Sequence, residues 1–147
     1  MANFGIDLKA LCDKYADRLD VVARKTVLDI GTSLVLKSPV GDPALWKHNP
    51  PKGYVGGRFR ANWQHGFNVT PSGVVDGVDP TGKESISGIG ARIDSQPSAG
   101  IHYLANNLPY ANALEFGHSS QAPGGMVGLT AAEFEQYVKE NVAKVKT

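Results

Sequence analysis

The chain has 147 residues, a formal net charge of +1, 41% hydrophobic residues and 20% charged residues. This length suits one domain, and this balance is that of an ordinary globular protein with a real core, which argues against wholesale disorder. So small a net charge gives no global reason to expect a nucleic-acid partner. We find no apolar run of about 18 residues that could span a membrane, and we expect no signal peptide. A single cysteine, Cys12, excludes an internal disulfide and fits a reducing cytosol.

The charges are unevenly distributed along the chain. Residues 1–36 are balanced, residues 37–63 have five basic side chains against one acidic (net +4), and residues 64–147 have five against eight (net −3). Opposite charges on successive segments suit head-to-tail contact between copies of the chain. A solvated loop with a few chance basic residues is an equally good explanation.

Apolar residues recur at steps of three and four over residues 8–34, which predicts an amphipathic helix of about eight turns. Its predicted face comprises Leu8, Leu11, Tyr15, Leu19, Val22, Thr26, Ile30 and Leu34. The helix should end before Ser38 and Pro39, because the residue before a proline is disfavoured in the helical region. Cys12 lies beside Leu8 and Leu11, and we interpret it as a small core residue rather than a reactive thiol.

The segment 38–57 contains four prolines and four glycines, so we expect irregular structure there. A loop of this length inside a compact domain is usually functional or disordered, and a flexible linker would not need Trp46 and Tyr54. We interpret the segment as an arm that becomes ordered against a partner. The alternative is that it folds over its own core and buries Trp46 there.

Alternating apolar residues over 61–69 predict a strand, and a turn signal at 71–73 followed by three valines over 74–78 predicts a short return strand. Together they would form a hairpin. The segment 79–94 is ambiguous: an isoleucine every three or four residues and a helix-start pattern at Thr81 and Glu84 favour a helix, although alternation also permits a strand. Residues 100–106 predict another strand, and residues 109–117 a helical turn or a bent strand.

The C-terminal segment predicts a helix that begins at Thr130, with Glu133 completing a capping box and Leu129 and Phe134 forming a hydrophobic staple. Its apolar face comprises Phe134, Tyr137, Val138, Val142 and Val145. We therefore predict one α+β domain over residues 1–147. It would have a small, mostly antiparallel sheet, a long N-terminal helix, a middle helix and a C-terminal helix packed on it, and a long Pro/Gly-rich loop.

The sequence contains no recognisable catalytic, metal-binding or cofactor-binding motif. The four histidines, His48, His65, His102 and His118, have no metal-ligand spacing. The chain lacks a nucleophile elbow, a phosphate loop and a complete dinucleotide fingerprint. We predict a protein that is not an enzyme, with no catalytic residues, no metal and no cofactor. A small hydrolase or nuclease with a scattered site around His65, His102 and Glu115 is the least favoured hypothesis.

Basic and aromatic residues are interleaved over residues 46–63, a pattern that can bind nucleic acid through phosphate contacts and stacking. At strand spacing, Arg58 and Arg60 would point the same way. They could then bind carboxylates of a neighbouring copy, and the candidates are Glu115, Glu133 and Glu135. We favour the protein contact and keep a small nucleic-acid-binding protein as the alternative function.

Two blocks of sequence stand in a defined order. The first is SPVGDP (38–43) continued by GYVGGRFRANWQ (53–64), and the second is NNLPYA (106–111) continued by LEFG (114–117) and APGGMV (122–127). With the helices before, between and after them, these blocks resemble the neck, or tail-completion, family of long-tailed bacteriophages. The resemblance covers most of the chain from about residue 20 onwards.

The resemblance implies a structural virion protein at the head–tail junction, similar to a tail terminator. The implied assembly is a ring, expected to be a hexamer, that caps the tail tube and joins it to the head connector. Its implied partners are copies of itself, the tail tube protein and the head-closure or connector protein. Genomic DNA would pass through the lumen without sequence-specific binding, and no membrane is involved. Such a protein is made in the host cytoplasm and located in the virion. The candidate interface residues are Trp46, Tyr54, Arg58, Arg60, Glu115, Pro123 and Met126.

Overall fold

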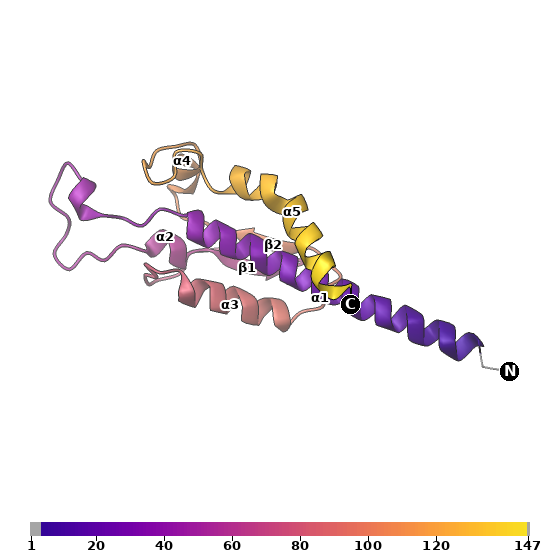
Figure 1. The fold of residues 1–147 in the computed structure, drawn as a ribbon. Coiled ribbons are helices and arrows are strands. Elements are labelled where there is room, and N and C mark those ends of the chain that lie inside the picture. Colours follow the sequence, from indigo (N-terminus) through magenta and orange to yellow (C-terminus); the bar gives the residue numbers. More distant parts are fainter. Residues whose placement is uncertain (1–3, 147) are drawn as a thin grey trace.

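The computed structural model describes the backbone of residues 4–146 and the side chains of residues 8–146. In chain order, the elements are α1 (Phe4–Lys37), the 3-10 turn η1 (Pro43–Leu45), α2 (Arg58–Ala61), β1 (Gln64–Phe67), α3 (Lys83–Asp94), β2 (His102–Ala105), α4 (Ala111–Glu115) and α5 (Val127–Val145). Figure 1 shows α1 running across the two strands, with α3 along one side and α5 crossing it on the other. The prediction of an α+β fold, with helices packed on a small antiparallel sheet, is confirmed.

The hydrophobic core lies where the second half of α1 meets α3 and the chain that follows the arm. Its buried apolar members are Leu34, Val35, Phe59, Trp63, Ile89, Ile93, Leu108, Ala122 and Met126. The predicted isoleucine face of α3 packs here, since Ile89 and Ile93 are buried and Ile86 is partly buried against them. Phe59 and Trp63 meet edge to face with ring centroids 6.0 Å apart, a favourable geometry for aromatic pairs.

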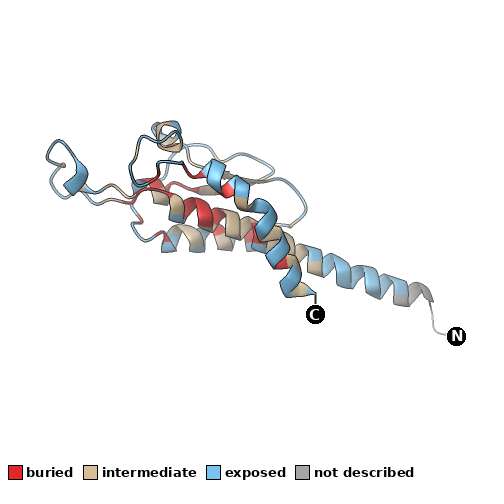
Figure 2. Ribbon diagram, turned by 45° about the horizontal axis from the view of Figure 1, so that its top comes forward, coloured by how far each residue is buried: buried red, intermediate tan, exposed pale blue. Residues whose placement is uncertain are grey.

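The long N-terminal helix is confirmed and ends at Lys37, but only its second half belongs to the core. In Figure 2, the described part of the first half projects beyond the body of the molecule and is coloured mostly as exposed. Cys12 lies in this exposed part, so the prediction that it is a core residue is wrong. Periodicity identifies the apolar face of a helix, but it does not reveal whether the same chain covers that face.

The predicted hairpin is wrong. Residues 58–61 form the short helix α2, residues 74–78 have no regular structure, and β1 pairs instead with β2. The buried amide of Asn62 explains the difference, because its Nδ2 donates to the Val75 carbonyl (3.0 Å) and its Oδ1 accepts from the Val75 N–H (2.8 Å). One side chain therefore satisfies the backbone groups that a return strand would have used.

The helix predicted between residues 79 and 94 forms over Lys83–Asp94, but its N-terminus differs from the prediction. The carboxylate of buried Asp79 accepts hydrogen bonds from the Gly82 N–H (2.9 Å) and from both the N–H and the hydroxyl of Ser85 (2.8 Å each). Burial raises the pKa of Asp79, but the hydrogen bonds from Ser85, Gly82 and Thr81 together lower it below its usual value. The predicted Thr81–Glu84 capping box is replaced by a shared cap, in which Asp79 accepts from the N–H groups of Gly82 and Ser85 and the Thr81 hydroxyl accepts from the Lys83 N–H (3.3 Å).

The predicted capping box at Thr130 and Glu133 is also wrong, because α5 already begins at Val127. The Glu115 carboxylate, at the end of α4, accepts hydrogen bonds from the N–H groups of residues 126, 127 and 128, at 2.8, 2.8 and 3.0 Å. A carboxylate at a helix N-terminus satisfies unpaired donors and interacts favourably with the helix dipole. Burial raises the pKa of Glu115, but these three donors lower it below its usual value.

We predict that Glu115→Gln lowers the free energy of unfolding at pH 7 by about 1 kcal/mol, because a neutral amide caps the helix less well. Since the folded-state pKa of Glu115 is lowered, its contribution is present above the unfolded pKa and lost as pH falls through the folded pKa. The difference between wild type and variant should therefore shrink as pH drops below about 4. Urea titrations from pH 7 to pH 3 measure it.

The matched control is Glu135→Gln, which removes an exposed carboxylate paired only with Lys139 on the surface of α5. Its effect at pH 7 should be smaller than that of Glu115→Gln. Equal effects of the two substitutions would contradict the capping role of Glu115.

Candidate functional site

The segment 38–57 forms an arm that projects from the end of the molecule opposite the start of α1 (Figure 1). At its tip, Trp46 packs on Tyr54 with ring centroids 4.7 Å apart, and these residues are 41% and 36% exposed. The alternative in which Trp46 is buried in its own core is therefore wrong. The ring contact joins the two legs of the arm, and Gly41 allows it, because a Cβ built at Gly41 would lie only 2.0 Å from the Tyr54 hydroxyl oxygen.

The base of the arm is held by side chains from elsewhere in the fold. The Gln121 amide donates to the Val40 carbonyl (2.7 Å) and accepts from the Val40 N–H (3.0 Å). The Trp63 indole N–H donates to the Ser38 hydroxyl (2.8 Å), which in turn donates to the Leu34 carbonyl (2.6 Å). The arm is thus a projecting loop on a fixed base rather than a segment without structure.

Arg60 belongs to this base and not to the surface. Its guanidinium donates to the backbone carbonyls of Leu36 (3.1 Å), Ser38 (3.0 Å) and Pro80 (2.7 Å). The expectation that Arg58 and Arg60 point the same way along a strand is wrong, because both lie on helix α2. Arg58 is exposed, whereas Arg60 is committed to its own chain and is not available to bind a neighbour's carboxylate.

An open groove of about 490 Å³ lies between the arm, α2, α4 and the loop that follows α4. Its lining includes Trp46, Tyr54, Arg58, Tyr110, His118 and Gln121. Burial raises the pKa of the Tyr110 hydroxyl, and the positive charge of Arg58 opposes that rise. The groove therefore presents aromatic rings, one exposed cation and several amide and hydroxyl groups, a composition suited to a protein partner.

Three of the seven candidate interface residues, Trp46, Tyr54 and Arg58, come together in this groove. Pro123 is exposed, but it lies outside the groove lining. Met126 is only 1% exposed and belongs to the core, so its assignment as an interface residue is wrong. Glu115 caps α5 and is not free for a partner either. Sequence reasoning missed His118 and Gln121, which have no periodicity or charge signal and lie between the quoted motifs of the second block.

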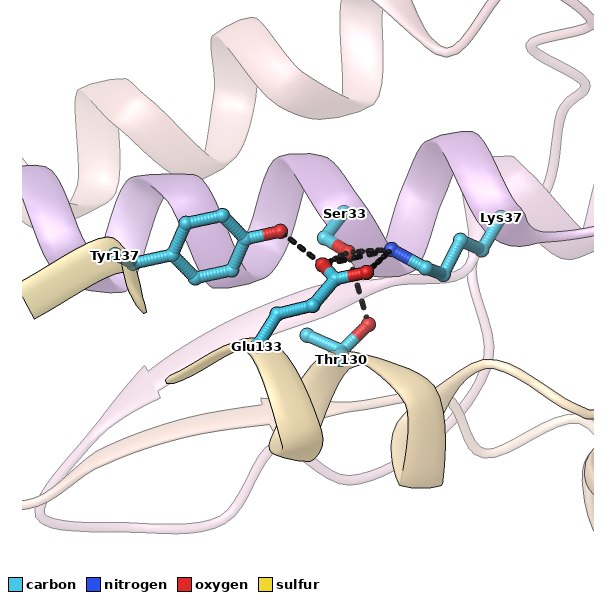
Figure 3. Close-up of polar contacts among 5 residues, drawn as sticks. All are labelled: Ser33, Lys37, Thr130, Glu133 and Tyr137. Atoms are coloured by element: carbon cyan, nitrogen blue, oxygen red, sulfur yellow. Dashed lines mark hydrogen bonds and ion pairs between the residues drawn. The ribbon is translucent and has the colours of Figure 1, made fainter. Parts of the chain in front are cut away.

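The other proposed acidic partner, Glu133, belongs to a polar cluster between α1 and α5 (Figure 3). Its carboxylate accepts hydrogen bonds from Tyr137 and Lys37, and the Lys37 ion pair measures 2.9 Å. The hydroxyls of Ser33 and Thr130 are 3.0 Å apart beside it. The Tyr137 hydrogen bond and then Lys37 lower the pKa of Glu133. Among the three proposed carboxylates, only Glu135 stays highly exposed, at 80% for its side chain.

The histidines of the hydrolase hypothesis form a pair across the sheet. His65 Nε2 lies 2.9 Å from His102 Nδ1, and His102 Nε2 lies 3.1 Å from the Ser98 carbonyl oxygen. Both lie on strands, as predicted. Among the side chains of residues 8–146 there is no group of three or more His, Cys, Asp or Glu that could hold a metal ion. None of the described helices combines the length and apolarity needed to cross a membrane.

Comparison of the chain with models of protein families, with curated proteins and with solved structures found no match.

We predict that His65 makes the free energy of unfolding decrease as pH falls below about 6.5. Burial lowers the pKa of His65, and the nearby His102 and Arg92 lower it further. As pH falls below about 6.5, the usual pKa of histidine, His65 takes up a proton in the unfolded chain but resists protonation in the folded chain. The free energy of unfolding therefore decreases as pH falls, by up to about 1.4 kcal/mol per pH unit.

In His65→Gln this slope should be reduced, whereas the control His118→Gln, which alters an exposed histidine, should keep it. Urea unfolding at half-unit pH steps provides the measurement. An unchanged slope in His65→Gln would contradict the assignment.

Proposed function

We propose that this chain is a structural protein of the head–tail junction of a long-tailed bacteriophage. In this proposal it assembles into a ring, expected to be a hexamer, that caps the tail tube and joins it to the head connector. The observation behind it is the groove at the base of the arm. The two sequence blocks that resemble the neck family are far apart in the chain, yet residues of both line this one groove.

The arm suits contact with a neighbouring subunit or with an adjacent ring. Its tip exposes Trp46, Tyr54 and Leu45, and large aromatic side chains often supply most of the binding energy at interfaces. The Trp46–Tyr54 contact and the fixed base already order the arm in the single chain. Preorganisation lowers the entropy cost of association. The arm would then bind as a preformed projection rather than fold on binding.

The proposal includes no catalytic role and no cofactor. The partners would be copies of the same chain, the tail tube protein and the connector protein, with genomic DNA passing through the lumen without sequence-specific contacts. Exposed Lys47, Lys52 and Arg58 on and beside the arm could face either the DNA or a neighbouring acidic surface such as the one around Glu135.

The second candidate is a small nucleic-acid-binding protein, and the observation that favours it is the same basic and aromatic arm. Against it, the Trp46 ring already packs on Tyr54, which leaves less of its surface for stacking on a base. A dissociation constant for single-stranded DNA that rises steeply with salt would support this candidate.

The decisive experiment is negative-stain microscopy of lysates from the parent phage with and without this chain. DNA-filled heads beside unjoined or overlength tails would support the proposed role. Intact infectious particles in the absence of the chain would overturn it and move the nucleic-acid-binding candidate to first place.

We predict that replacing residues 46–53 with two glycines leaves the fold intact but prevents function at the junction. The deleted segment contributes no residue to the core, and the hydrogen bonds that Gln121 and Trp63 make to the base of the arm lie outside it. Circular dichroism should give an unchanged spectrum and a melting temperature within a few degrees of wild type, since ΔΔG should stay within about 0.5 kcal/mol.

The same variant, supplied in trans, should fail to restore joined particles in the lysate assay. Glu84→Gln on the exposed surface of α3 is the control that should restore them. A deletion variant that unfolds would show that the arm stabilises the domain, and one that restores joined particles would show that the arm is not an interface.

A further inference from the structure

Residues 8–19 of α1 present an apolar stripe that no other described part of the chain covers. Leu8, Leu11, Tyr15 and Leu19 are 47%, 48%, 55% and 69% exposed. They continue, along the same helix face, the row that includes buried Thr26 and Leu34 in the second half. Figure 2 shows the change from exposed to buried along this one helix. Contiguous exposed apolar surface of this kind marks an interaction site.

The same chain also has an apolar groove without an occupant. It lies between the second half of α1, β2 and the start of α5, and its volume is about 480 Å³. The lining includes Val27, Ile30, Leu34, Leu104, Val127 and Phe134. Val127 and Phe134 are each 50% exposed at its edge. The predicted apolar face of α5 is therefore only partly covered within one chain.

The stripe cannot enter the groove of its own chain. Both surfaces use α1, which is one uninterrupted helix over Phe4–Lys37. At about 1.5 Å per residue, Leu19 lies about 12 Å along the axis from Val27, where the groove begins, and Leu8 lies still farther away. A continuous helix cannot fold back on itself, so only another molecule can bring a stripe to this groove.

We propose that a second copy of this chain provides that stripe. Residues 8–19 of one copy pack into the groove formed by α1, β2 and α5 of the next copy. Each subunit uses a different surface towards each of its two neighbours. Such a head-to-tail contact closes into a ring when the rotation between copies allows it. The inference rests on the proposed function in one respect, since it names the subunit contact of the proposed ring.

Two further observations favour this pairing over two stripes packing against each other. The stripe extends over residues 8–19, less than two heptads, whereas independent coiled coils need about three or four. Stripe-to-stripe pairing would also leave Phe134 and the groove exposed. In addition, residues 8–19 have a net charge of +1 (three basic, two acidic), and residues 127–140, counted with the Lys37 that pairs with Glu133, have −1 (two basic, three acidic). The two surfaces are therefore complementary in charge as well as apolar.

The test uses the full chain and two variants that each disable one surface. The stripe variant is Leu11→Glu with Leu19→Glu, and the groove variant is Phe134→Glu. All three side chains are about half exposed or more, so the substitutions should not disturb the fold, which circular dichroism checks. The control for the stripe is Val21→Glu, which alters an exposed residue of α1 outside the stripe, and the control for the groove is Leu129→Glu.

Light scattering coupled to size exclusion should give the wild type and both controls an average mass that rises with concentration above the 15.6 kDa of one chain. Each interface variant alone should remain monomeric, with association at least tenfold weaker. Mixed in equal amounts, the two variants should form a heterodimer and nothing larger. In that mixture, the intact stripe of the groove variant packs into the intact groove of the stripe variant. The other two surfaces of the heterodimer are both disabled, so it cannot grow further.

Cys12 provides an independent readout, because it is exposed on the stripe between Leu11 and Tyr15. Its reaction with a maleimide dye should slow at least tenfold on assembly of the wild type and stay fast in the groove variant. A groove variant that still dimerises would show that stripes pair with each other. A wild type that stays monomeric, or a mixture that forms no heterodimer, would also overturn the proposal.

These outcomes are separate from the test of the proposed function. If the variants assemble through other surfaces while lysates lacking the chain still contain unjoined tails, the subunit contact is wrong and the role at the junction stands. If lysates lacking the chain contain intact particles, the role at the junction fails, whatever the light scattering shows.

Discussion

The end of α1 is the constraint on which the rest of the structure depends. A helix leaves its last carbonyls without partners, and here the Arg60 guanidinium binds those of Leu36 and Ser38 while also holding the Pro80 carbonyl. The Ser38 hydroxyl joins the same junction through the Trp63 indole. One cluster of hydrogen bonds thus sets where the long helix stops, where the arm starts and where α2 packs. An arginine placed there serves the fold, although its sequence context suggests a surface contact.

Both sequence blocks that resemble the neck family likewise contain residues that stabilise the fold and residues that lie on the surface. Asn62 and Arg60 in the first block, and Glu115 and Met126 in the second, bind or pack within their own chain. Residues that line the groove, such as Tyr54 and Tyr110, precede these framework residues in each block. Much of each block therefore serves the fold, by positioning the arm (residues 38–57) and the N-terminus of α5. Only the remaining part of each block lies on surface that a partner could contact.

The periodicity of apolar residues correctly predicted the main helices and the second strand. It failed where a single side chain makes the backbone hydrogen bonds that a strand or a helix cap was expected to make. Helical spacing of apolar residues correctly predicted α1, α3 and α5, and the strand predicted over residues 100–106 forms as β2, although all four of its residues are half-buried. The hairpin failed because the Asn62 amide takes the hydrogen bonds of Val75, and the capping box at Thr130 failed because Glu115, distant in sequence, caps α5 one turn earlier. Exposed Cys12 shows a further limit, since helical spacing reveals an apolar face but not the molecule that covers it. The groove residues Gln121 and His118 could be found only from the fold.

The position of the exposed stripe depends on packing far from it. Gly31 lets α1 lie close to α3, because a Cβ at that position would be 3.1 Å from the Ile89 side chain. On the opposite side, the cluster of Lys37, Ser33 and Glu133 fixes α5 against the same helix. Since α1 is continuous, a small tilt set by these contacts is magnified at Leu8. In a head-to-tail assembly, that tilt determines the rotation from one copy to the next, and hence whether the chain closes into a ring or grows as a helix. If the proposed contact forms, the core around Gly31 would therefore set the geometry of the assembly as well as the stability of the subunit.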